Sequence, residues 1–169
     1  MISSLQRKLE STFRDVKVSR GDADRMSVSA PAGSIPEVLK CLKGMGLNHL
    51  ALISCVDWAD KQKLEIVYVL TCYMRDNADY SSEQRLHVLL RTFVPRKKPE
   101  LASVIEVFEI AEPYEREIHE LFGVNFEGHP RLIPLFLERA YEIPPFRKDF
   151  DTRKYVEKTF GSIPAVENE

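Results

Sequence analysis

The stretch EREIHELFGVNFEGHP, at positions 115–130, gathers the residues best suited to chemistry. It holds four glutamates and two histidines, together with glycines and a proline. Side chains of these types bind metals, transfer protons or pair with cations. Three interpretations follow: a metal site, an acid–base pair, or a helix end followed by a structured turn.

The spacing argues against both kinds of chemistry. Glu115 and His119 are four apart, so on a helix they share a face and could pair. The zinc-protease pattern HExxH needs a second histidine where Gly123 stands, and a metal needs three or four converging ligands. Glu115 and Glu117 point about 200° apart on a helix, so they cannot act as acid and base on one substrate.

A solvated helix face accounts for the same residues without chemistry. Glu112, Glu115 and Glu117 lie in the first turns of the predicted helix, where carboxylates complement the positive end of the helix dipole. Arg116 is placed to pair with Glu112 or Glu120 at a spacing of four.

Length and composition indicate one soluble globular domain, with a possible appended segment. The chain has 169 residues, of which 44% are hydrophobic and 30% charged, and its net charge is −2. That balance gives no reason to expect binding to nucleic acid or to an anionic membrane. The basic runs at 96–98 and 147–149 are short, and no glycine-rich nucleotide-binding pattern occurs.

The N-terminus and the cysteines indicate the compartment. The start, MISSLQRKLESTF, has no apolar segment of the kind found in signal peptides, so we expect no export. Cys41, Cys55 and Cys72 include no CxxC pair. Three cysteines in apolar contexts fit buried free thiols in a reducing cytoplasm, and we expect them to hold no cluster.

Hydrophobic periodicity predicts the elements of the core. We expect helices over 2–13, 35–45, 101–108 and 112–122, and strands over 16–18, 26–30, 49–58, 63–73 and 85–94. Ser34 and Glu37 have the spacing of a capping box that opens the second helix. A polar connector occupies 75–84, and Gly123 is expected to end the last helix.

After position 123 the regular patterns stop. The last part of the chain, 124–169, mixes five prolines with many aromatic and aliphatic residues and shows no sustained period. It is too apolar for simple disorder, so we expect it to lie extended on the protein's own domain or on a partner.

The expected fold is therefore α+β. A mixed β-sheet of four to five strands packs with helices in two layers over 1–123, and an extended C-terminal tail, 124–169, wraps a partner. No cofactor site or catalytic group is evident, so an assembly module is favoured over an enzyme. A free-standing α/β binding module and a metal-dependent hydrolase using the Glu115/His119 helix remain as alternatives.

Two linked motifs resemble the small hydrophilic C subunit of respiratory complex I, the thirty-kilodalton subunit. The first is EREIHELFGVNFEGHP, the second is PPFRKDF at 144–150, and the likeness extends over about 50–155. The matching positions are Glu115, Arg116, Glu117, Phe122, Gly123, Phe126, Gly128, His129, Pro130, Pro145, Arg147, Lys148, Asp149 and Phe150.

The chain departs from the family pattern at two places. His119 stands where an aspartate is usual, and RLIP at 131–134 replaces a run that commonly holds two further basic residues. Both an NADH–quinone complex and a prokaryotic membrane-bound, energy-converting hydrogenase or related complex stay open, with the prokaryotic relatives slightly favoured.

The resemblance implies a scaffold role in a membrane-bound, ion-translocating oxidoreductase complex. It implies the hydrogenase-like large subunit and the iron–sulfur small subunit as partners, and a peripheral place on the cytoplasmic face of a prokaryotic membrane. It implies no catalytic, cofactor-binding or metal-binding residue in this chain, with the redox centres in the partner subunits. The residues expected to serve the interface and its structure are Glu115, Arg116, Glu117, Phe122, Gly123, Gly128, His129, Pro130, Arg147, Lys148, Asp149 and Phe150.

These residues carry three expected roles. Arg116 offers a rigid fork of donors for a carboxylate on a neighbouring subunit or on the tail. Gly123 and Gly128 permit backbone conformations or close approaches that a Cβ would hinder. The run at 147–149 would anchor the far end of the tail.

Overall fold

The computed structural model describes residues 2–21, 24–74, 84–138 and 141–161. Its main sheet consists of β1 (Lys17–Arg20), β2 (Arg25–Ser29), β3 (His49–Trp58), β4 (Lys63–Met74) and β5 (Gln84–Pro95). The strand order is β1-β2-β5-β4-β3. Strand β2 pairs with β5 in parallel and the other neighbours pair antiparallel, so the predicted mixed sheet is confirmed.

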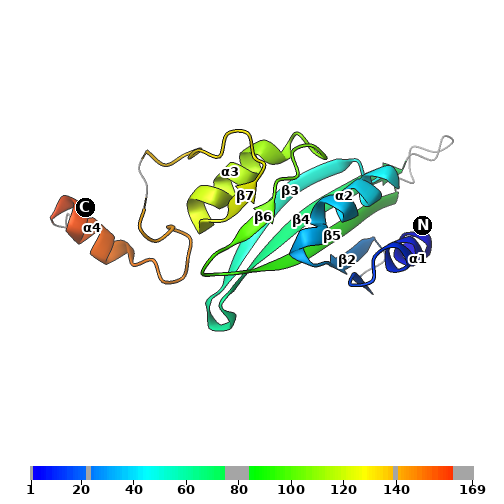
Figure 1. Cartoon of the computed structure of the whole chain (residues 1–169), viewed down its shortest axis with the longest axis horizontal. Helices are drawn as coiled ribbons and strands as arrows, with labels where there is room; N and C mark the ends of the chain where they lie inside the picture. Colours follow the sequence, from blue (N-terminus) through cyan, green and yellow to red (C-terminus); the bar gives the residue numbers. More distant parts are fainter. Residues whose placement is uncertain (1, 22–23, 75–83, 139–140, 162–169) are drawn as a thin grey trace, which may run out of the picture.

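Three helices supply apolar stripes to the core: α1 (Ile2–Thr12), α2 (Ile35–Gly44) and α3 (Ala111–Phe122). Figure 1 shows α2 and α3 lying over the sheet, with α1 beside them. The short 3-10 helix η1 (Ala32–Ser34) precedes α2. A second one, η2 (Ala59–Lys61), joins β3 to β4. The buried helix residues are Leu5, Leu9, Ile35, Val38, Leu39, Leu42, Ala111, Glu115, Ile118 and Leu121.

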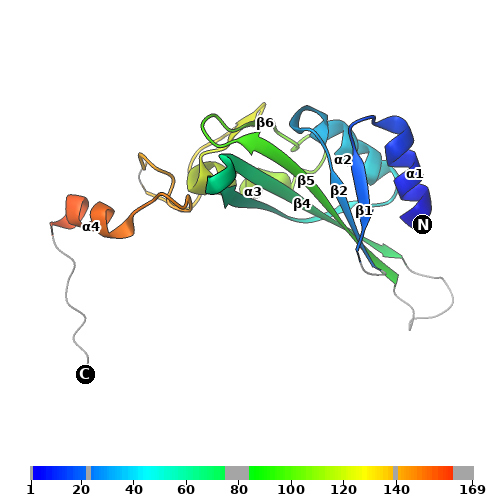
Figure 2. The same cartoon turned by 90° about the horizontal axis from the view of Figure 1, so that it is seen from below.

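The two faces of the main sheet differ in their cover. Successive residues of a strand point to opposite sides, and Tyr68 and Leu70 of β4 are buried on the side that bears the helices. On the other side Leu52, Val56 and Phe93 are exposed. Figure 2 views the sheet from this open side, with α2 and α3 behind it. The fold is therefore two-layered, as predicted.

Two local predictions are wrong. Ser34 does not form a capping box, because its hydroxyl donates to Pro31 O at 2.9 Å and accepts no helix amide. The helix expected over 101–108 is instead the strand β6 (Glu100–Ala102) followed by turns. Strand β6 pairs in parallel with β7 (Asn125–Glu127), and a run of eight residues is too short for its period to separate the two states.

The tail begins later than position 124. Val124 and Phe126 are buried in the core, and β7 ties this segment to β6. The chain leaves the core around Gly128, whose φ is 84°. The polar connector predicted over 75–84 lies outside the described residues except for Gln84.

A helix that the sequence interpretation missed lies within the tail: α4 (Thr152–Phe160). The carboxylate of Asp151 accepts from the amides of Arg153 and Lys154, and Gly161 follows with φ at 77°. An acidic N-cap and a glycine just past the end are recognised helix signals, but the nine intervening residues hold too few apolar positions to show a period.

The boundary between core and tail can be tested with two phenylalanines. Phe126→Ala should lower the free energy of unfolding by about 3–5 kcal/mol, because it empties a buried site. Phe136→Ala is the matched control, since this side chain is 68% exposed. It should change the value by less than about 0.5 kcal/mol in the isolated chain. Equal effects in urea unfolding would contradict this division.

Candidate functional site at the junction of α3 and the tail

Glu115 lies inside the protein, which contradicts the prediction of a solvated helix face. Its side chain is 0% exposed. The carboxylate accepts from Val104 N at 2.7 Å, and its other oxygen lies 2.7 Å from Ser103 Oγ. Position 115 lies four residues after Ala111 and three before Ile118, both of which are buried. These spacings place residue 115 on the same face of α3, within its apolar stripe.

Burial makes Glu115 a weaker acid than an exposed glutamate. Desolvation raises its pKa to about 7, and the hydrogen bonds from Val104 and Ser103 oppose that shift only in part. The protonated carboxyl can donate to Ser103 Oγ while still accepting from Val104 N. Glu115 therefore joins α3 to the segment after β6 and does not face solvent.

His119 does not pair with Glu115. Its Nδ1 lies 2.8 Å from Val124 O, and because a carbonyl only accepts, Nδ1 carries the hydrogen. Glu117 is half-buried on α3 and takes no part in these contacts. Within the described ranges, no group of three or more histidine, cysteine, aspartate or glutamate side chains is placed to hold a metal ion.

The cysteines lie on α2, β3 and β4. Cys41, Cys55 and Cys72 are free thiols, and burial raises the pKa of Cys55 to about 12. That they hold no cluster stays a prediction.

Arg116 holds the beginning of the tail. Its Nε donates to Ile133 O at 3.0 Å and its Nη2 to Pro134 O at 2.9 Å. The third nitrogen, Nη1, pairs with Glu112 at 3.3 Å, which is one of the two expected partners. The tail contacts of Arg116 are with backbone carbonyls and not with a carboxylate.

Glu120, one turn further along α3, continues this grip. Its carboxylate accepts from three successive amides, those of Leu135, Phe136 and Leu137. Arg116 and Glu120 together, called here the α3 clamp, bind the backbone of five consecutive tail residues, 133–137.

His129 fixes the turn before the α3 clamp. Its Nδ1 accepts from Arg131 N at 3.0 Å, and its Nε2 lies 3.4 Å from Glu112 O. Pro130 is exposed beside it. Gly128 adopts φ at 84° with nothing within 4 Å of an added Cβ, so its role is conformational alone.

The two sequence motifs meet at the C-terminal end of α3. Arg147 Nε donates to Phe122 O at 2.7 Å, and the rings of Phe122 and Phe146 stand edge to face at 5.8 Å. Gly123 ends α3 with φ at 74°. A Cβ there would stand 2.9 Å from Pro144 Cγ and 3.2 Å from Arg147 Nη2, so this glycine permits the close approach.

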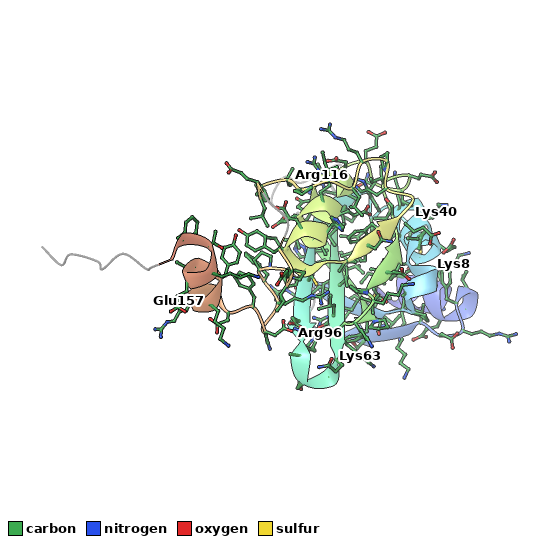
Figure 3. All side chains as sticks on the ribbon, turned by 60° about the vertical axis from the view of Figure 1, so that its left-hand side comes forward. Lys8, Lys40, Lys63, Arg96, Arg116 and Glu157 are labelled. Atoms are coloured by element: carbon green, nitrogen blue, oxygen red, sulfur yellow. The ribbon has the colours of Figure 1, made fainter. Side chains whose placement is uncertain are left out.

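A buried arginine fixes the same part of the tail to the sheet. Arg96, at the end of β5, donates to both oxygens of Asp57 at 2.8 and 3.0 Å. It also donates to both oxygens of Asp149 at 3.0 and 2.6 Å, and Lys148 N donates to Asp57 at 2.9 Å. The hydrogen bonds from Arg96 lower the pKa of Asp57 and of Asp149. Figure 3 labels Arg96 near the β3–β4 turn, apart from Arg116.

Sequence reasoning missed Arg96 and Asp57. Arg96 belongs to the run RKK at 96–98, which resembles an ordinary solvated charge cluster. The available signal was Asp57, the single acidic residue of the apolar strand β3, because a buried carboxylate requires a partner.

A family model described as "Respiratory-chain NADH dehydrogenase, 30 Kd subunit" matches residues 28–156. The chain belongs to this family. It is 36% identical over 117 residues to the C subunit of the F(420)H(2) dehydrogenase of Methanosarcina mazei, with 68% of each chain covered. It is 32% identical to the C subunit of the NADH-quinone oxidoreductase of Chelativorans sp., covering 90% of this chain and 72% of that one.

Solved structures share the fold. A chain of the membrane-bound sulfane sulfur reductase (MBS), an archaeal respiratory membrane complex, matches with a TM-score of 0.80 at 24% identity, covering 99% of this chain and 95% of that one. The trypsin-resistant fragment (1–134) of Nqo5 matches with a TM-score of 0.61 at 24% identity, covering 78% and 98%. No helix among the described residues is long and apolar enough to cross a membrane.

The buried carboxyl of Glu115 should make stability fall as pH rises. Below about pH 4.5 the group is protonated in both states. Between about 4.5 and 7 the unfolded chain releases the proton and the folded chain keeps it, so about 3 kcal/mol of stability is lost over that window. Glu115→Gln should remove this slope in urea unfolding measured across pH, whereas Glu117→Gln should preserve it. A wild type without the slope would contradict a neutral, buried Glu115.

Removing Arg96 leaves two carboxylates without their cation. Arg96→Ala should lower the free energy of unfolding by about 3–5 kcal/mol near neutral pH. Lys98→Ala is the control, because that side chain is 80% exposed, and its pair with Glu100 should contribute at most about 1 kcal/mol.

Acid should abolish the contribution of Arg96. The pKa of Asp57 in the folded state lies below its ordinary 3.8, so the contribution is present above that pH and is lost as pH falls through the lower folded value. The wild type and Arg96→Ala should therefore converge in acid unfolding. A constant difference down to the lowest pH would argue against the pairing.

Proposed function

We propose that this chain is a scaffold subunit of a membrane-bound, ion-translocating oxidoreductase complex. It docks beside the hydrogenase-like large subunit and contributes position, not chemistry. Membership of the thirty-kilodalton subunit family supports the class of complex.

The observation that carries the proposal is the way the tail is held. The α3 clamp binds the tail backbone, and the side chain of Arg147, in the tail, donates to the carbonyl of Phe122 on α3. Phe136 and Phe146 nevertheless remain 68% and 61% exposed. Large apolar side chains on an anchored backbone cannot turn inward to escape water, and such patches mark interaction sites. The tail therefore offers a docking surface that is already in place before a partner arrives.

The relatives agree on an assembly and differ in the chemistry they name. Their names include an F(420)H(2) dehydrogenase and NADH-quinone oxidoreductases, and a structural neighbour belongs to a sulfane sulfur reductase. A fold shared among such different reactants is better suited to a common place in the assembly than to binding any one of them.

A fused relative supports the identity of the neighbour. The C/D subunit of the NADH-quinone oxidoreductase of Phocaeicola vulgatus is 35% identical over 115 residues, which make up 68% of this chain and 20% of that one. A single polypeptide that carries both letters in its name would keep the two parts adjacent. In our proposal the D-type partner is the hydrogenase-like large subunit, and the tail after about residue 128 wraps it.

The remaining features of the proposal follow from this placement. The chain lies peripherally on the cytoplasmic face, the iron–sulfur small subunit is its second neighbour, and the redox centres reside in the partners. The twelve motif residues from Glu115 to Phe150 serve the interface or the structure that supports it, and Glu115 does so from inside the core. The proposal covers both NADH–quinone complexes and hydrogenase-type relatives.

The geometry gives no support to a hydrolase built on Glu115 and His119. The carboxylate of Glu115 points into the core toward Ser103, and His119 is engaged with Val124 O instead of with Glu115. A substrate or metal would have to reach a side chain that is fully buried. A second alternative is a free-standing binding module. Only a measurement of assembly with partner subunits distinguishes it from a scaffold subunit.

Arg116→Ala tests the role of the α3 clamp. The variant should remain folded, because its lost contacts are with the tail and with one partly exposed carboxylate. Its incorporation into the complex should fall by about 10-fold or more, since truncating a hydrogen-bonded charge at an interface commonly has an effect of this size. Activity per assembled complex should stay near that of the wild type.

Arg131→Ala is the matched control, because Arg131 is an exposed tail arginine outside the clamp. It should assemble normally. If Arg116→Ala assembles fully but the complex does not turn over, the scaffold proposal fails and a chemical role for α3 must be sought.

A further inference from the structure

The open face of the main sheet carries a continuous group of apolar side chains. Residues paired across neighbouring strands point to the same side, and Val56 and Phe93 are both paired with Glu65. Leu52, Val56 and Phe93 are 40%, 40% and 45% exposed, on the side opposite α2 and α3 (Figure 2). The group, called here the sheet patch, consists of Leu52, Val56 and Trp58 of β3, Val67 and Val69 of β4, and Leu89 and Phe93 of β5.

The sequences of β4 and β5 are typical of strands that are covered on both sides. The segments IVYVL at 66–70 and LHVLL at 86–90 are apolar at nine of their ten positions. A sheet with one face in water instead alternates apolar with polar residues. Strand β2, with the sequence RMSVS, shows that alternation, and its Ser27 and Ser29 belong to the same open face. The sequence therefore calls for a cover over β3, β4 and β5 and not over β2.

One carboxylate lies within the sheet patch and is already satisfied. Glu65 is 5% exposed. Its two oxygens accept from Trp58 Nε1 at 2.9 Å and from Arg91 Nη1 at 3.2 Å. Glu65 and Arg91 thus balance each other, and the charge that a partner meets comes from the residues around them.

That surrounding charge is positive. The Nζ atoms of Lys61 and Lys63 lie 4.5 and 6.0 Å from the ring centres of the two aromatic side chains in the patch. The charged residues described on this face and in the turns at its ends are Lys17, Arg25, Lys61, Lys63, Arg91, Asp24, Asp60 and Glu65. Along the chain, residues 1–99 hold 16 basic and 11 acidic side chains, whereas residues 100–142 hold 3 and 10. A surface that carries carboxylates is therefore complementary to the patch.

Two other occupants fit this surface less well. A second copy of the chain would bring two positively charged faces together in an isologous contact. An anionic lipid surface matches the charge but not the shape, because neighbouring strands are rotated by about 20–25° and the sheet is twisted. Figure 2 shows β4 and β5 crossing the direction of β1 and β2. A flat bilayer would therefore meet only part of the patch.

A single helix has the dimensions of the sheet patch. Strands spaced about 4.8 Å apart place β3 and β5 about 10 Å from each other, which is the width of one helix with its side chains. From residue 52 to residue 58 the patch extends about 20 Å along β3, the length of a helix of about 13 residues. Helices α2 and α3 already lie over the other face of the sheet (Figure 1).

We propose that the sheet patch is the docking surface for an acidic amphipathic helix of another protein. The helix places its apolar stripe on the patch and its carboxylates beside Lys61 and Lys63. The sheet is then covered on both faces, as the sequences of β4 and β5 require. This inference goes beyond the scaffold function, because the observations behind that function concern α3 and the tail that it holds, and α3 lies on the opposite side of the sheet.

Crosslinking in the native assembly identifies the occupant. In cells that make the complex, Val56→p-benzoylphenylalanine should form a light-dependent adduct with one other protein. The adduct peptide should have apolar residues at helical spacing, with aspartates and glutamates between them. A carbodiimide, which joins an amine directly to a carboxylate, should link Lys63 to the same segment. The photo-crosslinker at Ser19, an exposed residue of β1 on the same face, is the control and should give less than about a tenth of the adduct.

Substitutions in the chain that carries the photo-crosslinker at position 56 test the chemistry of the contact. Lys63→Glu should lower the adduct yield about 10-fold, because the new carboxylate faces those of the helix. Phe93→Ala should lower it about 30-fold, the effect of losing a central aromatic contact. Lys98→Glu is the matched control, since this lysine is 80% exposed and pairs with Glu100 of β6. Its yield should equal that of the unsubstituted chain.

Different failures have different meanings. If the chain is recovered with its complex but position 56 gives no protein adduct, the sheet patch is not a docking surface and the scaffold function stands. An adduct with a second copy of this chain overturns the proposal, as does flotation with phosphatidylcholine–phosphatidylserine vesicles that Phe93→Ala abolishes. An unchanged yield for Lys63→Glu overturns the acidic helix. A chain recovered with no other subunit overturns the scaffold function, whereas an adduct with an acidic helix in that case still supports the sheet patch.

Discussion

The pairing of one arginine with two aspartates determines where the tail can go. Arg96 is nearly buried and binds Asp57 of the sheet and Asp149 of the tail with both oxygens of each. Asp57 cannot stay charged in its buried place without this cation, and the fork of Arg96 leaves room for the second carboxylate from the tail. The tail is therefore held at Asp149 even though few apolar side chains there are buried. The ring of Phe150 and, through it, α4 take their positions from this point.

Helix α3 gives charged residues of the first motif structural roles. Glu115 faces inward and joins α3 to the segment after β6, whereas Arg116 faces outward and holds the tail. At its C-terminal end, Gly123 leaves room for Arg147, which reaches the carbonyl group of the last helical residue. Three neighbouring contacts thus connect α3 to the core, to the beginning of the tail and to its far end. These contacts require charged side chains at positions 115 and 116 and a residue without a side chain at 123, and the first motif has such residues there.

The sequence predicted an element correctly where the local repeat of its apolar residues determines its structure. It failed where contacts with residues far along the chain determine the structure. The strands at 49–58, 63–73 and 85–94 and the helix ended by Gly123 were predicted correctly, because their apolar residues repeat locally. Arg96 could not be placed, since its partners lie 39 and 53 residues away. The burial of Glu115 was missed because charge was weighed above its position on the apolar stripe. Helix α4 was missed because its packing is supplied by rings outside it.

The contacts between the α3 clamp and the tail do not depend on the side chains of the tail. The run RLIP at 131–134 departs from the pattern expected at this point, yet the α3 clamp still engages it. Arg116 binds carbonyl oxygens of Ile133 and Pro134, and Glu120 binds the amides that follow, so the clamp recognises a backbone path and not side chains. Proline is acceptable at 134 because only its carbonyl is used. The α3 clamp therefore places no demand on the side chains of residues 133–137.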